Sequence, residues 1–248
     1  MKLVIPMAGE GSRFSKAGYS LPKPLIDVRG KPMIQQVIDN LQFSNITEYI
    51  FIVRKEHVDA FNIDKVLKTI CKGKNVSIVV VDRLLKGSAM SILEARNYIN
   101  TDEEILVANS DQFVEFSKEN FEIFKNLGFE FFGSTIKIDS FIFTFRAVSS
   151  KWSFVELNAQ NRVIRVAEKN PISDIANCGI FWFRDGKQLL KQIDSMVSSN
   201  FMVNNEFYLA PSYNFNQDIN VYPFFVHKMW GLGTPEDLEV FLNESNLP

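Results

Sequence analysis

Short apolar runs alternate with apolar stripes at helical spacing along the first half of the chain. A continuous apolar run predicts a buried strand, and apolar residues three and four positions apart predict a helix. By this pattern we predict strands at Leu3–Pro6, Tyr49–Val53, Val76–Val81 and Ile105–Ala108, and helices at Pro32–Phe43, Val58–Ile70 and Gly87–Ile99. Strands that are apolar throughout and alternate with helices indicate a parallel sheet covered on both faces.

The pattern changes after Asp111, where strand-like runs follow one another more closely. They lie at Phe141–Arg146, Trp152–Leu157, Arg162–Ala167, Ile180–Phe183 and Val221–Val226. The polar residues 158–161 predict a hairpin turn between the second and third of these runs. We predict a helix at Lys187–Val197 and a last helix that begins at Thr234, with Pro235 in its first position and an acid in its third.

These elements predict an α/β fold in one domain of 248 residues. Its first half is a Rossmann-like, mostly parallel sheet flanked by helices, and its second half is an antiparallel portion. In open sheets of this kind, ligands bind beyond the carboxyl ends of the strands. We therefore expect the candidate residues discussed below to lie at such ends.

Composition narrows the class of protein. The formal net charge is −2, which argues against a nucleic-acid-binding protein, because such proteins carry a basic excess. No apolar stretch approaches the ~20 residues that a membrane span needs. Cys71 and Cys178 are too few for a disulfide framework, and His57 and His227 have no zinc-site spacing. We expect a cytoplasmic protein with no nucleic-acid or membrane partner.

The segment of residues 7–14, Met-Ala-Gly-Glu-Gly-Ser-Arg-Phe, is the strongest candidate for chemistry. Its glycines let the backbone turn sharply and bring N–H groups close to an anion. It does not have the spacing of a P-loop. It is also not a dinucleotide fingerprint, because Phe14 takes the place of the third glycine, and residues 15–24 have the pattern of a loop. Arg13 and Lys23 add two cations within reach, as a polyphosphate needs.

The string G-x-G-x-R-[FLM], followed by Lys23-Pro24, resembles the signature of the sugar-nucleotide pyrophosphorylase family of nucleotidyltransferases. The resemblance implies the nucleotide-diphospho-sugar transferase fold in a single domain, 1–248, with a nucleotide-binding half (1–115) and an acceptor-binding half (116–248). It implies catalytic roles for Arg13 and Lys23. Residues implied to bind the nucleotide are Ala8, Gly9, Glu10, Gly11, Ser12, Gly87 and Ser88.

Asp111 follows a predicted strand, where a carboxylate is well placed to hold Mg²⁺ together with phosphate oxygens and water. In the family, the matching Asp is a metal ligand. A second family ligand is missing here, because the W-x-D-x-G-T-P-E segment has Gly231 in place of its Asp. The metal would then be held by Asp111 with water and phosphates alone, or by another carboxylate such as Glu206 or Asp218.

Three further segments resemble the acceptor-binding elements of the family. They are the E-K-P element, here with Asn170 inserted before the proline, the N-x-G-[IV] element and the [GN]-E-[FY] element. Each segment alone is also compatible with a solvated strand end, but all occur in the order of the family. The residues implied to bind the acceptor are Glu168, Lys169, Asn177, Gly179 and Glu206.

The resulting hypothesis is Mg²⁺-dependent transfer of a nucleoside monophosphate from an NTP to a phosphorylated acceptor, with release of pyrophosphate. The sequence of residues 7–14 and the altered metal segment resemble those of family branches that serve the decoration of capsules or other surface polysaccharides. They favour CTP over UTP or dTTP, and an acceptor that is a sugar 1-phosphate or a headgroup such as phosphocholine or phosphoglutamine. Two alternatives stay open: a glycosyltransferase of the related GT-A type, although Asp111 lacks a D-x-D partner, and a non-catalytic sensor. The oligomeric state is not predicted.

Overall fold

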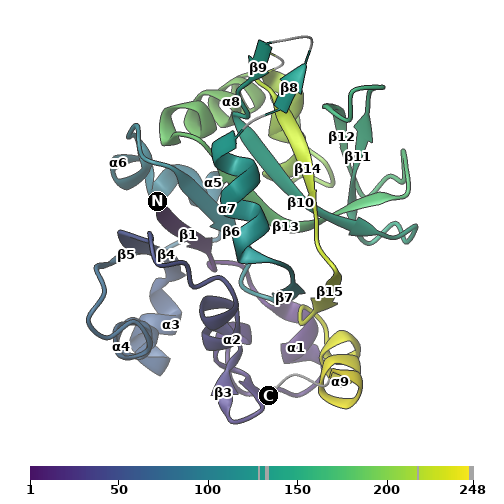
Figure 1. The fold of residues 1–248 in the computed structure, drawn as a ribbon. Helices are drawn as coiled ribbons and strands as arrows, with labels where there is room; N and C mark the ends of the chain where they lie inside the picture. Colours follow the sequence, from purple (N-terminus) through teal and green to yellow (C-terminus); the bar gives the residue numbers. More distant parts are fainter. Residues whose placement is uncertain (128, 132–133, 217, 246–248) are drawn as a thin grey trace.

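The computed structural model describes residues 1–127, 129–131, 134–216 and 218–245 (Figure 1). Its centre is a sheet of nine strands among these residues. The first half contributes four neighbouring parallel strands: β6 (Ile105–Ala108), β1 (Lys2–Pro6), β4 (Glu48–Arg54) and β5 (Val76–Val81). Leu3 and Ile5 pack on one face of the sheet and Val4 on the other, which is why these strands are apolar throughout.

The second half continues the same sheet in the antiparallel sense. Strand β13 runs antiparallel to β6, so strands from both halves of the chain meet in one sheet. Beyond it, β11 and β12 form an antiparallel hairpin through the predicted turn, and β10 pairs with β13 and with β14. The bounds of these strands are β10 (Ser140–Arg146), β11 (Ser153–Leu157), β12 (Val163–Glu168), β13 (Ile175–Phe183) and β14 (Val221–Phe225). The predicted α/β class is confirmed.

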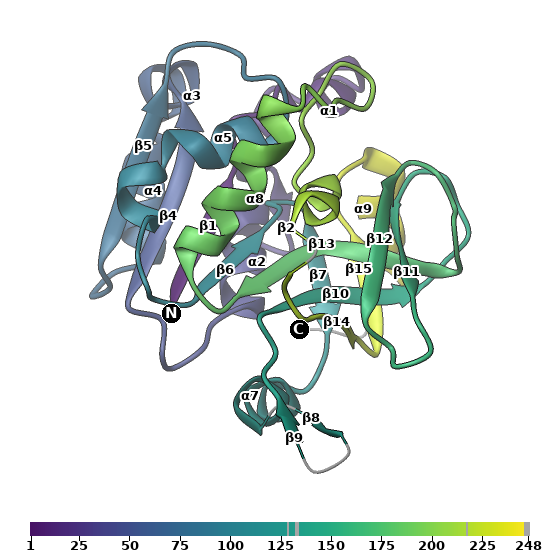
Figure 2. The ribbon, with the colours of Figure 1, turned by 90° about the horizontal axis from the view of Figure 1, so that it is seen from above.

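Helices cover both faces of the sheet. One face carries α2 (Met33–Asn40), α3 (Lys55–Phe61), α4 (Ile63–Ile70) and α7 (Lys118–Leu127). The other carries α5 (Ser88–Glu94), α6 (Arg96–Ile99) and α8 (Gly186–Ser198), and Figure 2 shows α5 and α8 side by side. Within the described ranges, no helix is long and apolar enough to cross a membrane.

A smaller apolar cluster, separate from those on the main sheet, joins residues 14–33 to residues 230–241. It packs α1 (Ser12–Lys16) and α9 (Pro235–Glu244) around the two-stranded sheet of β7 (Gln112–Glu115) and β15 (Lys228–Gly231). Helix α9 begins as predicted, because Thr234 caps it by accepting the N–H of Asp237. The remaining short elements are β2 (Asp27–Val28), β3 (Lys31–Pro32), β8 (Phe129–Phe131), β9 (Ser134–Ile136) and the 3₁₀ turns η1 (Lys23–Leu25) and η2 (Ala210–Phe215).

Several sequence predictions were wrong in detail. The helix predicted at Val58–Ile70 is two helices, because Asn62 adopts a left-handed conformation (φ 52°) between α3 and α4. The helix predicted at Gly87–Ile99 is likewise divided, at Ala95. The loop predicted for residues 15–24 holds the end of α1 and the start of η1. Strand β13 begins five residues before the predicted Ile180.

Candidate active site

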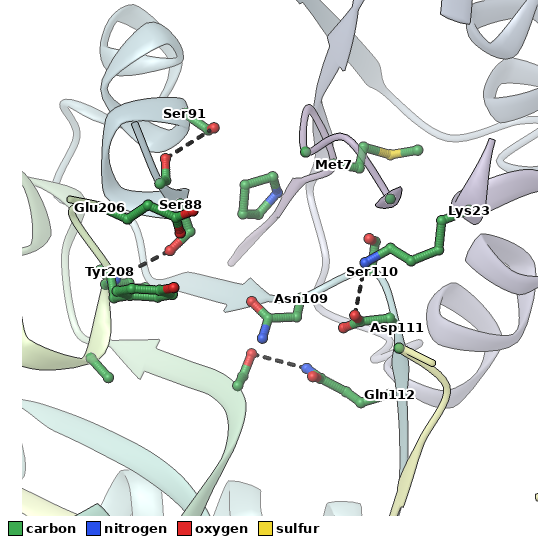
Figure 3. A pocket seen from close by; sticks show the side chains of 18 of the residues that line it. Met7, Lys23, Ser88, Ser91, Asn109, Ser110, Asp111, Gln112, Glu206 and Tyr208 are labelled. Carbon is green, nitrogen blue, oxygen red and sulfur yellow. Dashed lines mark hydrogen bonds and ion pairs between the residues drawn. The ribbon is translucent and has the colours of Figure 1, made fainter. Parts of the chain in front are cut away.

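A cavity of about 500 Å³ opens where the parallel strands β1 and β6 end (Figure 3). It brings together side chains from both halves of the chain, because β13 lies beside β6. Of the predicted site residues, fourteen line it: Ala8, Gly9, Glu10, Gly11, Ser12, Arg13, Lys23, Gly87, Ser88, Asp111, Glu168, Asn177, Gly179 and Glu206. Lys169 is not among the lining residues. Its ammonium group donates to the hydroxyl of Tyr208, which does line the cavity, at 2.8 Å.

The glycine-rich loop enters α1 through Gly11, which has a left-handed backbone (φ 63°). A Cβ at Gly11 would lie 3.1 Å from Cβ of Lys23. Glycine is therefore needed twice here, for the backbone angle and for the close approach of the loop to Lys23. Phe14 is buried and anchors α1. Arg13 is exposed on the cavity side and has no ion pair within the described part of the chain.

Lys23 and Asp111 form an ion pair inside the cavity, with 2.8 Å between Nζ and Oδ2 (Figure 3). The two side chains are 22% and 24% exposed, so both are accessible from the cavity. Buried Pro24 fixes Lys23 in η1. The carbonyl of Asp111 accepts the N–H of Leu232 at 2.8 Å, which ties the end of β6 to the segment that follows β15.

Gly87 and Ser88 close the cavity from the side of α5. Gly87 has a φ of 98°, and a Cβ there would lie 2.5 Å from the carbonyl oxygen of Phe207. The helix is capped by Gly87, without a hydrogen bond from a side chain. The Ser88 hydroxyl instead accepts the N–H of Leu209 at 3.2 Å. This contact fixes the segment that carries Glu206 and Tyr208 (Figure 3).

Glu168, Glu206 and Tyr208 form a further wall of the cavity, and Lys169 adjoins it through its hydrogen bond to Tyr208. Burial raises the pKa of Glu168 to about 7, although Lys169 and the hydroxyl of Ser153 act to lower it. The hydrogen bond to Tyr208 raises the pKa of Lys169, which therefore stays an ammonium group. The same ammonium lies 4.9 Å from the centre of the Tyr208 ring. This wall thus combines carboxyl groups, a cation and an aromatic face.

Asn177 and Gly179 lie inside β13, not at a strand end, so our expectation was wrong for these two residues. Strand β13 is antiparallel to β6, and its amino-terminal half therefore extends past the carboxyl end of β6. Asn177 accepts the N–H of Gly179 and donates to the hydroxyl of Ser153. A Cβ at Gly179 (φ 75°) would overlap the side-chain amide of Asn109, so only glycine fits.

Sequence analysis missed several residues that line the cavity, and those with polar side chains include Asn109, Lys151, Tyr208 and Asp237. Asp237 accepts a hydrogen bond from Nζ of Lys151 at 2.8 Å. Asn109 points toward the middle of the cavity (Figure 3). Only its position could have identified Asn109 as a site residue, because it directly follows β6 and ligands bind beyond the carboxyl ends of such strands. No motif marks Lys151, which precedes β11 in a turn.

The fold and the cavity together define an α/β protein with a polar, charged cavity at the carboxyl ends of its parallel strands. The sequence profile described as "Nucleotidyl transferase" matches residues 2–239. The chain therefore belongs to the nucleotidyl transferase family, which confirms the resemblance that residues 7–24 indicated.

Individual relatives are distant. The chain is 26% identical over 191 residues to the bifunctional protein GlmU of Methanocaldococcus jannaschii, covering 74% of this chain and 40% of the relative. It is 38% identical over 121 residues to the bifunctional IPC transferase and DIPP synthase of Archaeoglobus fulgidus, covering 46% and 22%. The chain thus spans 40% or less of the length of these curated relatives. The nucleoside-diphosphate-sugar pyrophosphorylase from Vibrio cholerae RC9 has a similar structure, with a TM-score of 0.78 at 26% identity over 98% of this chain and 100% of that chain.

Proposed function

We propose that this protein transfers a nucleoside monophosphate from an NTP to a phosphorylated acceptor and releases pyrophosphate. An oxygen of the acceptor phosphate attacks the α-phosphorus. The bond from that phosphorus to the oxygen it shares with the β-phosphate breaks, and pyrophosphate keeps the electron pair. The observation that carries the proposal is that Arg13, Lys23, Asp111 and the glycine-rich loop all line the same cavity.

The reaction asks for charge neutralisation more than for proton transfer. A phosphate monoester has its second pKa at about 6, so the acceptor is already largely a dianion near neutral pH and needs no general base. The difficulty is to bring two anions into line. A cavity lined by Arg13, Lys23 and Lys151 and by the N–H groups of a glycine loop is suited to this task.

Each part of the cavity has a role in this proposal. The loop and Arg13 hold the β- and γ-phosphates, which leave together. Lys23 lies between the α-phosphate and the acceptor phosphate, where negative charge is most crowded. Gly87 and Ser88 border the base. Lys169 reaches the acceptor phosphate from the rim, and the rest of the acceptor contacts Glu168, Asn177, Gly179 and Glu206.

Mg²⁺ is the metal that suits this donor set. Mg²⁺ takes one or two carboxylates and completes its shell with water and substrate phosphates. Asp111 offers a carboxylate that lines the cavity, and its one side-chain partner among the described residues is the ammonium group of Lys23. When bound, the ion would neutralise charge on the α-phosphate and on the leaving group.

The finer assignments are CTP as the nucleotide, a sugar 1-phosphate or a headgroup such as phosphocholine or phosphoglutamine as the acceptor, and a role in capsule or surface-polysaccharide synthesis. They rest on the sequence of residues 7–14 and on the glycine at position 231, which resemble the sequences of such branches of the family. The two cysteines are free and buried, as expected for a reducing, cytoplasmic setting.

Thermal unfolding with each of four NTPs and Mg²⁺ identifies the nucleotide, because a ligand at 100 times its Kd stabilises a protein by about 2.7 kcal/mol. Pyrophosphate release with that NTP and a set of phosphorylated acceptors then tests the reaction. Lys23→Ala and Arg13→Ala should each lower the rate by about 10²–10³, the usual effect of removing a preorganised charge partner. Lys31→Ala, which removes a surface ion pair with Asp39, is the matched control and should leave the rate unchanged.

Two results would refute the proposal. Release of free NDP from an NDP-sugar would mean glycosyl transfer. NTP binding without pyrophosphate release, whichever acceptor is supplied, would mean a sensor.

A further inference from the structure

A second carboxylate, that of Asp237, lines the cavity together with Asp111. Asp237 lies in the first turn of α9 and pairs with Lys151 at 2.8 Å, the same distance as between Asp111 and Lys23. The Asp237 side chain is 25% exposed, close to the 24% of Asp111. The cavity therefore holds two aspartate–lysine pairs with the same N–O distance and with carboxylates of similar exposure, whereas Lys151 is more exposed than Lys23.

Both carboxylates lie against one short segment of the chain. A Cβ at Gly233 would lie 2.7 Å from Oδ2 of Asp111, and a Cβ at Gly231 would lie 3.3 Å from Oδ2 of Asp237. Strand β15 also places Gly231 opposite Gln112, the residue after Asp111. Both carboxylates thus pack against one three-residue segment whose outer positions carry no side chain. The carboxylate of Asp237 occupies the space into which a side chain at position 231 would extend.

Helix capping does not explain the orientation of Asp237. An acid at the third helical position often turns back to the N–H of the cap residue. Here the N–H of Asp237 donates to the Thr234 hydroxyl at 3.1 Å, but its carboxylate bonds to Lys151 instead. Lys151 is 50% exposed, and ion pairs of exposed lysines are weak. The carboxylate is therefore available to a stronger cation.

We propose that Asp237 is the second carboxylate of the metal centre and that Lys151 is its exchangeable counter-ion. This inference rests on the nucleotidyl transfer proposed above. Of the two candidates named from the sequence, Glu206 lies across the cavity beside Tyr208 (Figure 3), and Asp218 is not among the residues that line the cavity. Two carboxylates match the usual protein contribution to a Mg²⁺ site. An ion held by both would free Lys23 and Lys151 for phosphate groups.

Titration with Mn²⁺ alone, followed by the electron paramagnetic resonance signal of free Mn²⁺, tests the inference without any assay of activity. Asp237→Asn keeps the size of the side chain and should weaken Mn²⁺ binding by about tenfold or more. Asp218→Asn is the matched control and should bind as the wild type does. Lys151→Ala should tighten binding by about threefold, because it removes the competing cation. A purely structural role for the Lys151–Asp237 pair predicts no such gain.

A rescue variant separates ligand loss from local unfolding. Adding Gly231→Asp to Asp237→Ala, which vacates that space, sends a new carboxylate toward the place of the lost one and should restore Mn²⁺ binding to within about threefold of the wild type. The inference is overturned if Asp111→Asn abolishes binding while Asp237→Asn does not weaken it, a result that leaves nucleotidyl transfer standing. Absence of both Mn²⁺ binding and pyrophosphate release in the wild type would overturn the proposed function as well.

Discussion

Glu168 couples the stability of this protein to pH. Burial raises the pKa of its carboxyl group from an ordinary 4.5 to about 7 in the folded protein, whereas the unfolded chain titrates near pH 4.3. Below pH 4.3 both states are protonated and the group has no net effect. As the pH rises, the unfolded state releases its proton first, so stability falls until the folded carboxyl also ionises near pH 7. At 1.36 kcal/mol per pKa unit, a difference of about 2.7 units gives a total loss of at most about 3.7 kcal/mol.

The variant Glu168→Gln removes this effect, because its amide does not titrate. We expect the unfolding free energy of Glu168→Gln, relative to the wild type, to increase by about 2–3 kcal/mol between pH 5 and pH 8.5. Urea unfolding followed by tryptophan fluorescence at the two pH values measures the difference directly. Comparing the two proteins at each pH cancels the titration of other groups, such as His57, whose pKa is lowered by burial.

Glu239→Gln replaces an exposed carboxylate of α9 and controls for the loss of one surface charge. The reasoning is refuted if the difference between Glu168→Gln and the wild type is the same at both pH values. A difference that shrinks toward high pH would reverse the sign of the coupling and would contradict burial as the dominant influence on this carboxyl.

Two glycines allow equally direct tests. Gly233→Ala places a carbon 2.7 Å from Oδ2 of Asp111, so the carboxylate must move by roughly 0.7 Å to reach ordinary contact. Because a shift of about 1 Å in a reacting group costs about 10²-fold, pyrophosphate release should fall by that order, and an unchanged rate would contradict the role of Asp111. Gly87→Ala combines a φ of 98° with a Cβ 2.5 Å from a backbone carbonyl and should lower the unfolding free energy by about 3 kcal/mol in urea unfolding. Gly73→Ala has a similar φ of 79° with nothing within 4 Å, so equal losses in the two variants would show that the clash is unimportant.

The strands of the first half were predictable because each is a mainly apolar run, although β5 lies at the edge of the sheet and is only partly buried. The predicted Leu3–Pro6 differs from β1 by one residue, and Val76–Val81 matches β5. The division of the second helical region was not predictable in this way. Its apolar stripe continues across Asn62, and only the left-handed backbone at that residue separates the two helices. Asparagine tolerates that conformation, and the spacing of apolar residues does not reveal it.

The site was predictable where a local motif supplied its residues. Residues 8–13, Lys23 and Asp111 are close in space because each follows a strand or turn at one edge of the sheet. Lys151 and Asp237 reach the same cavity through a tertiary arrangement that no local motif encodes. Asp237 is placed by the pairing of β7 with β15, whose short length gives a weak signal. The alternation in Gln112–Glu115, with Phe113 half-buried and Val114 buried, becomes meaningful only once the partner strand is known.

The strength of the ion pairs in the cavity bears on how such a site can bind phosphates. A fully buried lysine–aspartate pair would be costly to separate, because one charge would remain desolvated without a partner. The Lys23–Asp111 pair is partly exposed on both sides, so its net stabilisation is small and its partners can be exchanged at little cost. Each pair holds a lysine and a carboxylate in position while neutralising both. In the proposed reaction, a phosphate would take the place of the aspartate as partner of the lysine, and the aspartate would then be free to hold a divalent ion. On this argument the paired state is already organised for transfer, and binding requires an exchange of partners with little rearrangement of the backbone.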